Sequence, residues 1–131
     1  MKKMAVTIVR CGSTERLCML KDKSGLWCFP EADVSDTLFT ISHAVVSCLS
    51  AIGDIRNIML MCIVSNQKRQ KDLEELYLYL TEFDEEKGID VGSNYKTFGW
   101  LAFENVFKLK TNASPVSQYA IDVLKSMSSD G

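Results

Sequence analysis

Apolar runs separated by polar segments predict several short strands in this chain. Met4 to Val9 and Arg16 to Leu20 are apolar or β-branched, and the segment CGSTE between them carries the glycine and serine of a hairpin turn. Ile55 to Ser65 is nearly all apolar after its first turn, which is typical of a strand buried on both faces. Leu76 to Phe83 and Thr97 to Phe103 are the remaining predicted strands.

A helical period replaces the strand pattern in two other segments. Between Thr37 and Ile52, apolar residues recur every three or four positions, with Ser35-Asp36 as cap candidates in front and Gly53 behind. Near the end, Ser114 is a candidate cap and Pro115 a first helical residue. A short helix over 104–109 completes the prediction. The element order favours an α/β (α+β) fold, in which a mixed sheet lies between helices.

Bulk properties fit one intracellular domain spanning residues 1–131. The chain is 47% hydrophobic and 24% charged, as is typical of a globular protein, and it lacks an apolar run long enough to cross a membrane. The start has no secretory signal pattern, so we expect a location in the cytoplasm or nucleus. The five cysteines have no CxxC spacing and are interpreted as reduced core thiols.

A known signature matches the stretch from Trp27 to Gly53, WCFPEADVSDTLFTISHAVVSCLSAIG. In the Nudix hydrolases, a strand ending in W-x-x-P-G-G leads into the pattern G-x5-E-x7-R-E-U-x-E-E-x-G-U, where U is aliphatic. The chain resembles this family and keeps its spacing from Pro30 to Gly53 without insertion or deletion. The resemblance implies a Nudix-type α/β/α sandwich with a mixed sheet.

The same resemblance shows that the acids of the signature are replaced. Ala32 stands where the family has its glycine, and the degenerate positions along the helix are Leu38, Val46, Ser47, Ser50 and Ala51. In the family, the carboxylates hold divalent metals that bind the diphosphate and activate water, which these side chains cannot do. We therefore expect a pseudoenzyme without catalytic residues, metal or other cofactor. Glu31, Asp33 and Asp36 are interpreted as a solvated polar turn.

Further motifs narrow the resemblance to the diphosphoinositol polyphosphate phosphohydrolase branch. These are NQKR at 66–69 before a tyrosine-rich strand, Trp100 with Glu104, and the Pro-Val pair at 115–116. In that branch, basic residues near the first strand and in the NQxR loop contact the phosphorylated substrate. The resemblance thus makes Lys2, Lys3 and Arg69 ligand-binding candidates. Some of the branch's phosphate-binding residues are missing, because Met4 and Ser114 stand where the branch has basic residues.

Three functional hypotheses follow. The first is an inactive Nudix-like adaptor or subunit of an intracellular complex, with Phe39 and Val46 as the surface that contacts a protein partner. The second is a sensor that binds a nucleotide or inositol polyphosphate through the retained cations without hydrolysing it. RNA is a disfavoured variant of this ligand, because the pI is near 5.4. The third is a residual hydrolase that uses Glu31 or Asp36.

Overall fold

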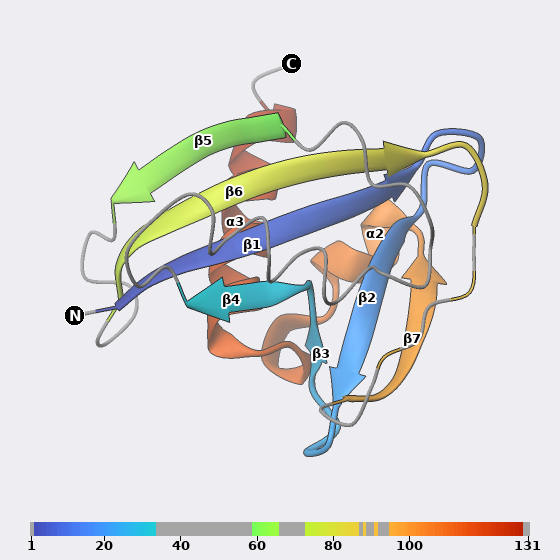
Figure 1. Cartoon of the computed structure of the whole chain (residues 1–131), viewed down its shortest axis with the longest axis horizontal. Helices are drawn as coiled ribbons and strands as arrows, with labels where there is room; N and C mark the ends of the chain where they lie inside the picture. Colours follow the sequence, from blue (N-terminus) through green and yellow to red (C-terminus); the bar gives the residue numbers. More distant parts are fainter. Residues whose placement is uncertain are drawn as a thin grey trace.

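The computed structural model describes residues 2–33, 59–65, 73–86, 88, 91 and 95–129. In this part of the chain, seven strands form one sheet in the order β3-β2-β1-β6-β5, with β4 paired to β1 and β7 paired to β2 (Figure 1). The strands are β1 Lys2–Cys11, β2 Leu17–Asp22, β3 Trp27–Cys28, β4 Glu31–Asp33, β5 Met59–Ser65, β6 Leu73–Phe83 and β7 Tyr95–Leu101. The helices are α2 Phe103–Phe107, the short 3-10 turn η2 Lys110–Asn112, and α3 Pro115–Ser129.

Strands β1 and β6 form the centre of the sheet and run parallel to each other. Their register extends from Lys2 opposite Leu73 to Cys11 opposite Phe83. The other strand pairs are antiparallel, including β1 with β2 and β5 with β6. The sheet is therefore mixed, as predicted, and the antiparallel β1–β2 pair confirms the hairpin predicted at CGSTE.

Two strands, β2 and β4, pair with different parts of the same edge of β1. The C-terminal end of β1 pairs with β2, whereas its N-terminal part pairs with β4. Between them, the Thr7 amide donates a hydrogen bond of 3.0 Å to the Pro30 carbonyl. The chain thus leaves β3, which pairs with β2, and turns through Phe29 and Pro30 to reach β1. Figure 1 shows β2, β3 and β7 running across the direction of β1, β5 and β6.

Alternation along the strands produces two apolar clusters, one on each face of the sheet. The cluster on the helix side combines strand residues with α2 and α3; its largest fully buried side chains include Val6, Ile8, Leu17, Met19, Phe29, Leu76, Leu78 and Val106. The opposite face has a smaller cluster of Ala5, Val9, Cys18, Leu20, Cys28, Tyr79 and Phe83. The period of two in each strand explains why neighbouring residues join different clusters.

The C-terminal helix begins where the sequence predicts. The Ser117 amide donates to the Ser114 hydroxyl at 3.2 Å, so Ser114 caps the helix that starts at Pro115. Helix α2 is shorter than the predicted 104–109 segment. The predicted helix from Thr37 to Ile52 lies outside the described residues. Among the described residues, no helix is both long and apolar enough to span a membrane.

The prediction that the segment ending at Ser65 is buried on both faces is wrong for β5. This strand is the last in the strand order, and Met59, Leu60 and Ile63 are exposed. Its other apolar residues Met61, Cys62 and Val64 pack against the helix-side cluster. An apolar run without alternation does not distinguish a central strand from an outer one, so the sequence pattern could not show this exposure.

Candidate functional site

Most of the predicted site residues lie outside the part of the chain that the structure describes. These residues are Leu38, Phe39, Val46, Ser47, Ser50, Ala51 and Arg69. Lys2 and Lys3 lie at the start of β1. The structure therefore locates the beginning of the predicted cation cluster but does not test its contact with Arg69.

Lys3 is half-exposed and lies next to an acid. Its Nζ atom is 3.9 Å from the Glu75 carboxylate on the neighbouring strand β6, and 41% of the Lys3 side chain is exposed. At this distance and exposure the pair is weak, because water screens it. Lys3 can still reach an anionic ligand, although Glu75 offsets part of its charge.

The segment that turns from β3 into β4 is tied to the first turn of α3. The Ser114 amide donates to the Trp27 carbonyl at 2.9 Å, and the Phe29 amide donates to the Ser117 hydroxyl at 2.9 Å. Phe29 and Ser117 are fully buried. Two elements far apart in the sequence are thus joined at the position where the resemblance places the beginning of the signature.

A single carboxylate completes this connection. The hydroxyls of Ser114 and Ser117 both donate to Glu31 Oε2, each at 2.6 Å. Partial burial raises the pKa of Glu31, the two serine hydrogen bonds oppose this rise, and the negative charge of Asp22 adds to it. We name the group formed by Glu31, Ser114 and Ser117 the Glu31 clasp.

The Glu31 clasp corrects the interpretation of Glu31 as part of a solvated turn. Glu31 is partly buried in β4 and bonded to α3, whereas Asp33 at the end of β4 is exposed. Asp36 lies outside the described residues. The sequence did not reveal this contact, since the bonded residues are more than 80 positions apart. Within the described ranges, no group of three or more acids, histidines or cysteines is arranged to hold a metal ion.

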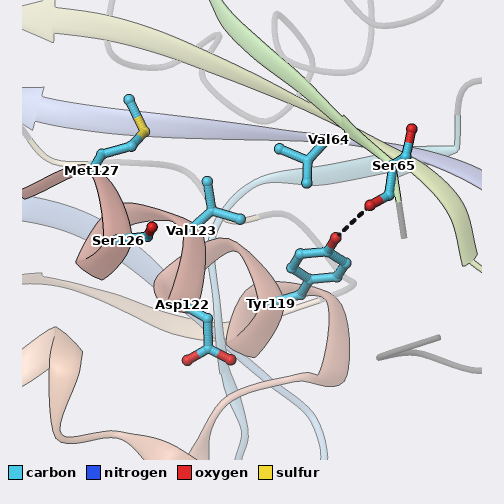
Figure 2. Close-up of a pocket in the computed structure, with 7 residues that line it drawn as sticks. All are labelled: Val64, Ser65, Tyr119, Asp122, Val123, Ser126 and Met127. Carbon is cyan, nitrogen blue, oxygen red and sulfur yellow. Dashed lines mark hydrogen bonds between the residues drawn. The ribbon is translucent and has the colours of Figure 1, made fainter. Parts of the chain in front are cut away.

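A groove of about 320 Å³ lies between β5 and α3 (Figure 2). Val64 and Ser65 form one wall, and the other is formed by α3 residues Tyr119, Asp122, Val123, Ser126 and Met127. The Tyr119 hydroxyl donates to the Ser65 carbonyl at 3.0 Å and holds the two walls together at one end. The remaining lining is both apolar and acidic.

Exposed apolar side chains gather on the strand beside this groove. The exposed fractions are 59% for Met59, 45% for Leu60 and 51% for Ile63, and Met127 on α3 is 43% exposed. Sequence reasoning missed this surface because it assigned the segment to the interior. An exposed apolar strand at the end of a sheet is a typical contact site for another polypeptide.

No family model matches the chain, and no curated protein matches it. Solved structures do. The NUDIX domain of Shewanella oneidensis NrtR, complexed with ADP ribose, aligns with a TM-score of 0.70 at 12% identity, covering 95% of this chain and 86% of that one. An Ap4A hydrolase from C. elegans aligns with a TM-score of 0.66 at 12% identity, covering 96% of both chains.

A third similar structure is a MutT NUDIX hydrolase from Burkholderia pseudomallei. Its TM-score is 0.65 at 15% identity, and the alignment covers 92% of this chain and 95% of that one. At such identities the likeness concerns the fold. In each case the alignment covers most of both chains, including the mixed sheet of this one. The chain therefore has the Nudix fold.

Proposed function

We propose that this protein is a catalytically inactive Nudix-fold protein that works as a protein-interaction module, as an adaptor or subunit of an intracellular complex. The replacement of the signature acids by Leu38, Ser47, Ser50 and Ala51 supports the loss of hydrolysis. Hard divalent ions need several anionic oxygen ligands, and these side chains supply none.

The Glu31 clasp is consistent with this loss. Glu31 and Asp33 are the acids of the signature loop that the structure describes, and the Oε2 atom of Glu31 already accepts two hydroxyl hydrogen bonds. These two hydrogen bonds hold the carboxylate against the start of α3. The arrangement therefore favours a structural role for Glu31 over a relocated metal site.

The observation that carries the interaction hypothesis is the exposure of Met59, Leu60 and Ile63 on β5. Apolar side chains that remain in water cost free energy, about 25 cal/mol for each Å² of apolar surface. A protein partner that covers these side chains would remove that cost. This surface replaces Phe39 and Val46 as the first one to test, because it is described and exposed.

A hydrolysis assay tests whether the protein is catalytically inactive, as proposed. The full chain is incubated with Mg²⁺ or Mn²⁺ and with ADP ribose, Ap4A or a diphosphoinositol polyphosphate, and the release of cleavage products (nucleotides and ribose 5-phosphate, or phosphate) is measured by chromatography. We expect no release above that of a sample without protein. Metal-dependent turnover that disappears in Glu31→Gln would contradict the proposal, provided that Glu31→Gln remains folded by circular dichroism.

An affinity-capture experiment tests whether the protein binds a partner through these surfaces. The tagged chain is expressed in its native cells, and stoichiometric partners are quantified by mass spectrometry for wild type, Ile63→Lys and Phe39→Asp. Thr97→Lys is the matched control, because Thr97 is an exposed residue on the different strand β7. We expect Ile63→Lys to lose the partner and Thr97→Lys to keep it. A partner set that is unchanged by both Ile63→Lys and Phe39→Asp would reject these surfaces.

Binding of a phosphorylated ligand without hydrolysis is the second candidate. The half-exposed Lys3 side chain at the start of β1 favours it. The similar NrtR domain was solved with ADP ribose, which makes that compound a reasonable first ligand. Isothermal titration with ADP ribose and inositol hexakisphosphate should give heat that decreases in Lys3→Ala. No heat at high micromolar ligand would eliminate this candidate.

A further inference from the structure

We propose that Glu75 competes with an anionic ligand for Lys3 and thereby makes this site prefer ligands of low charge. The inference rests on the second candidate of the proposed function, which is the binding of a phosphorylated ligand through Lys3. It adds the residue that determines which phosphorylated ligands the site accepts.

Lys3 and Glu75 lie side by side near the starts of the two central strands. The parallel register of β1 and β6 places them opposite each other (Figure 1). The Lys3 Nζ atom is 3.9 Å from Glu75 Oε1, and among the described residues Glu75 is the only acid that forms an ion pair with Lys3. A phosphate group that binds Lys3 therefore has to share this cation with the Glu75 carboxylate.

Tyr77 holds the Glu75 carboxylate in place. Because it follows Glu75 by two residues on β6, its side chain lies on the same face of the sheet, where it packs against the smaller apolar cluster. A hydrogen bond from the Tyr77 hydroxyl to Glu75 is the main cause that raises the pKa of Tyr77. A carboxylate held in this way leaves Lys3 less readily, so Tyr77 is a positioning residue for Glu75.

The exposure of the pair shows that a ligand can displace it. The Lys3 side chain is 41% exposed and that of Glu75 is 28% exposed, so water screens their attraction. A phosphate can approach Lys3 from solvent without unfolding the strand. The contact with Glu75 thus lowers the affinity for an anion but does not prevent its binding.

The negative charge of Glu75 acts on the whole ligand and not only on the group that contacts Lys3. Coulomb repulsion increases with each further negative charge near the carboxylate. Inositol hexakisphosphate carries many more negative charges than ADP ribose, so Glu75 should weaken its binding more. Met4 and Ser114, which stand where the similar branch has basic residues, leave fewer cations to balance such a polyphosphate.

Isothermal titration of the full chain at low ionic strength tests this inference, because salt would screen the effect. Glu75→Gln keeps the shape of the side chain and removes its charge. We expect it to bind inositol hexakisphosphate about fivefold more tightly than wild type does, and ADP ribose about twofold more tightly. Tyr77→Phe, which frees the carboxylate, should give a smaller gain in the same direction.

Glu104→Gln is the matched control, because it removes the charge of an exposed acid on α2. We expect it to bind both ligands as wild type does, and circular dichroism checks that each variant is folded. A gain in Glu104→Gln equal to that in Glu75→Gln would show an effect of net charge alone and would overturn the inference. An equal gain for the two ligands in Glu75→Gln would also overturn it.

Two outcomes separate this inference from the function on which it rests. Heat of binding that is present in wild type and unchanged in Glu75→Gln would overturn the inference and leave ligand binding intact. No heat in either protein at high micromolar ligand would overturn both. In that case, the protein-interaction function assigned to β5 would still stand.

Discussion

The turn between β3 and β4 and the outer strand β5 belong to one sheet but have opposite surroundings. At the turn, the Glu31 clasp and the amide of Phe29 join the sheet to α3 through hydrogen bonds between 2.6 and 2.9 Å. On β5, apolar side chains are left exposed and the outer edge has no described partner strand. The first region uses polar groups to hold the fold together, whereas the second leaves apolar groups available for contact.

In the proposed function, this difference corresponds to a Nudix fold that keeps its structural contacts without the acids of the signature. The residues around Pro30 have structural contacts, because β4 pairs with β1 and Phe29 belongs to the helix-side cluster. Their retention does not require catalysis. The exposed residues of β5 contribute little to the core, and the proposed function assigns their apolar character to a contact outside the chain. We therefore expect substitutions in the two regions to have different effects on stability and on partner binding.

The largest effect is expected from breaking the clasp. Glu31→Ala leaves the Ser114 and Ser117 hydroxyls without their acceptor, and we expect it to lower the free energy of unfolding by about 2 kcal/mol. Urea denaturation followed by circular dichroism measures this loss. Asp33→Ala is the matched control, since Asp33 is exposed on the same strand. Equal stability of the two variants would show that the clasp is not structural.

Thiol reactivity compares the two regions without mutation. Burial raises the pKa of Cys18 on β2 to about 12, whereas Cys62 on β5 is only partly buried and the rise in its pKa is smaller. Because the thiolate is the reactive form, we expect iodoacetamide to label Cys62 roughly tenfold faster than Cys18 in the native protein. Mass spectrometry of digests measures both sites. Faster labelling of Cys18 would contradict the assignment of β2 to the interior.

A smaller effect concerns pH. Partial burial raises the pKa of Glu31, so the folded protein keeps this proton to a higher pH than the unfolded chain does. The contribution of Glu31 to stability is then fully present below its unfolded pKa and declines as the pH rises through its folded pKa. The stability advantage of wild type over Glu31→Gln should therefore decrease as the pH rises from about 4, near the ordinary pKa of a glutamate, through the raised pKa of the folded state. A stability advantage of wild type that increases with pH would contradict a raised pKa of Glu31 in the folded protein.

The smallest effect on stability is expected on β5. Ile63→Lys places a charge on a side chain that is already half-exposed, so the free energy of unfolding should change by no more than about 0.5 kcal/mol. Chemical denaturation checks this value. A loss of 2 kcal/mol or more would mean that Ile63 belongs to the core of the folded chain, and its loss of partner binding could then not be attributed to the surface.

Local sequence patterns predicted much of the fold. The features that they did not predict depend on contacts between residues far apart in the sequence. The β1–β2 hairpin, the strand β6 and the start of α3 at Pro115 follow from turn residues, alternation and capping, which are local signals. The clasp joins Glu31 to serines more than 80 residues away, so no local pattern contains it. Similarly, the apolar content of β5 says nothing about its place at the end of the sheet.

The candidate site was predicted less completely than the fold. Lys3 was predicted just before the first strand and lies within β1. Its neighbour Glu75 comes from the parallel strand β6 and could be identified only from the register. The degenerate signature positions and Arg69 remain predictions from the sequence, because they lie outside the described residues. The groove between β5 and α3 is formed by two segments that are distant in the chain, and neither segment alone suggests it.

The central claim is that β5 is the surface through which this protein contacts another polypeptide. Its most direct test is photo-crosslinking in native cells, with a benzophenone amino acid placed at Ile63 and, as a control, at Thr97 on β7. The account predicts one abundant cross-linked partner from position 63 and none from position 97. Equal, diffuse cross-linking from both positions, or none from either, would contradict it.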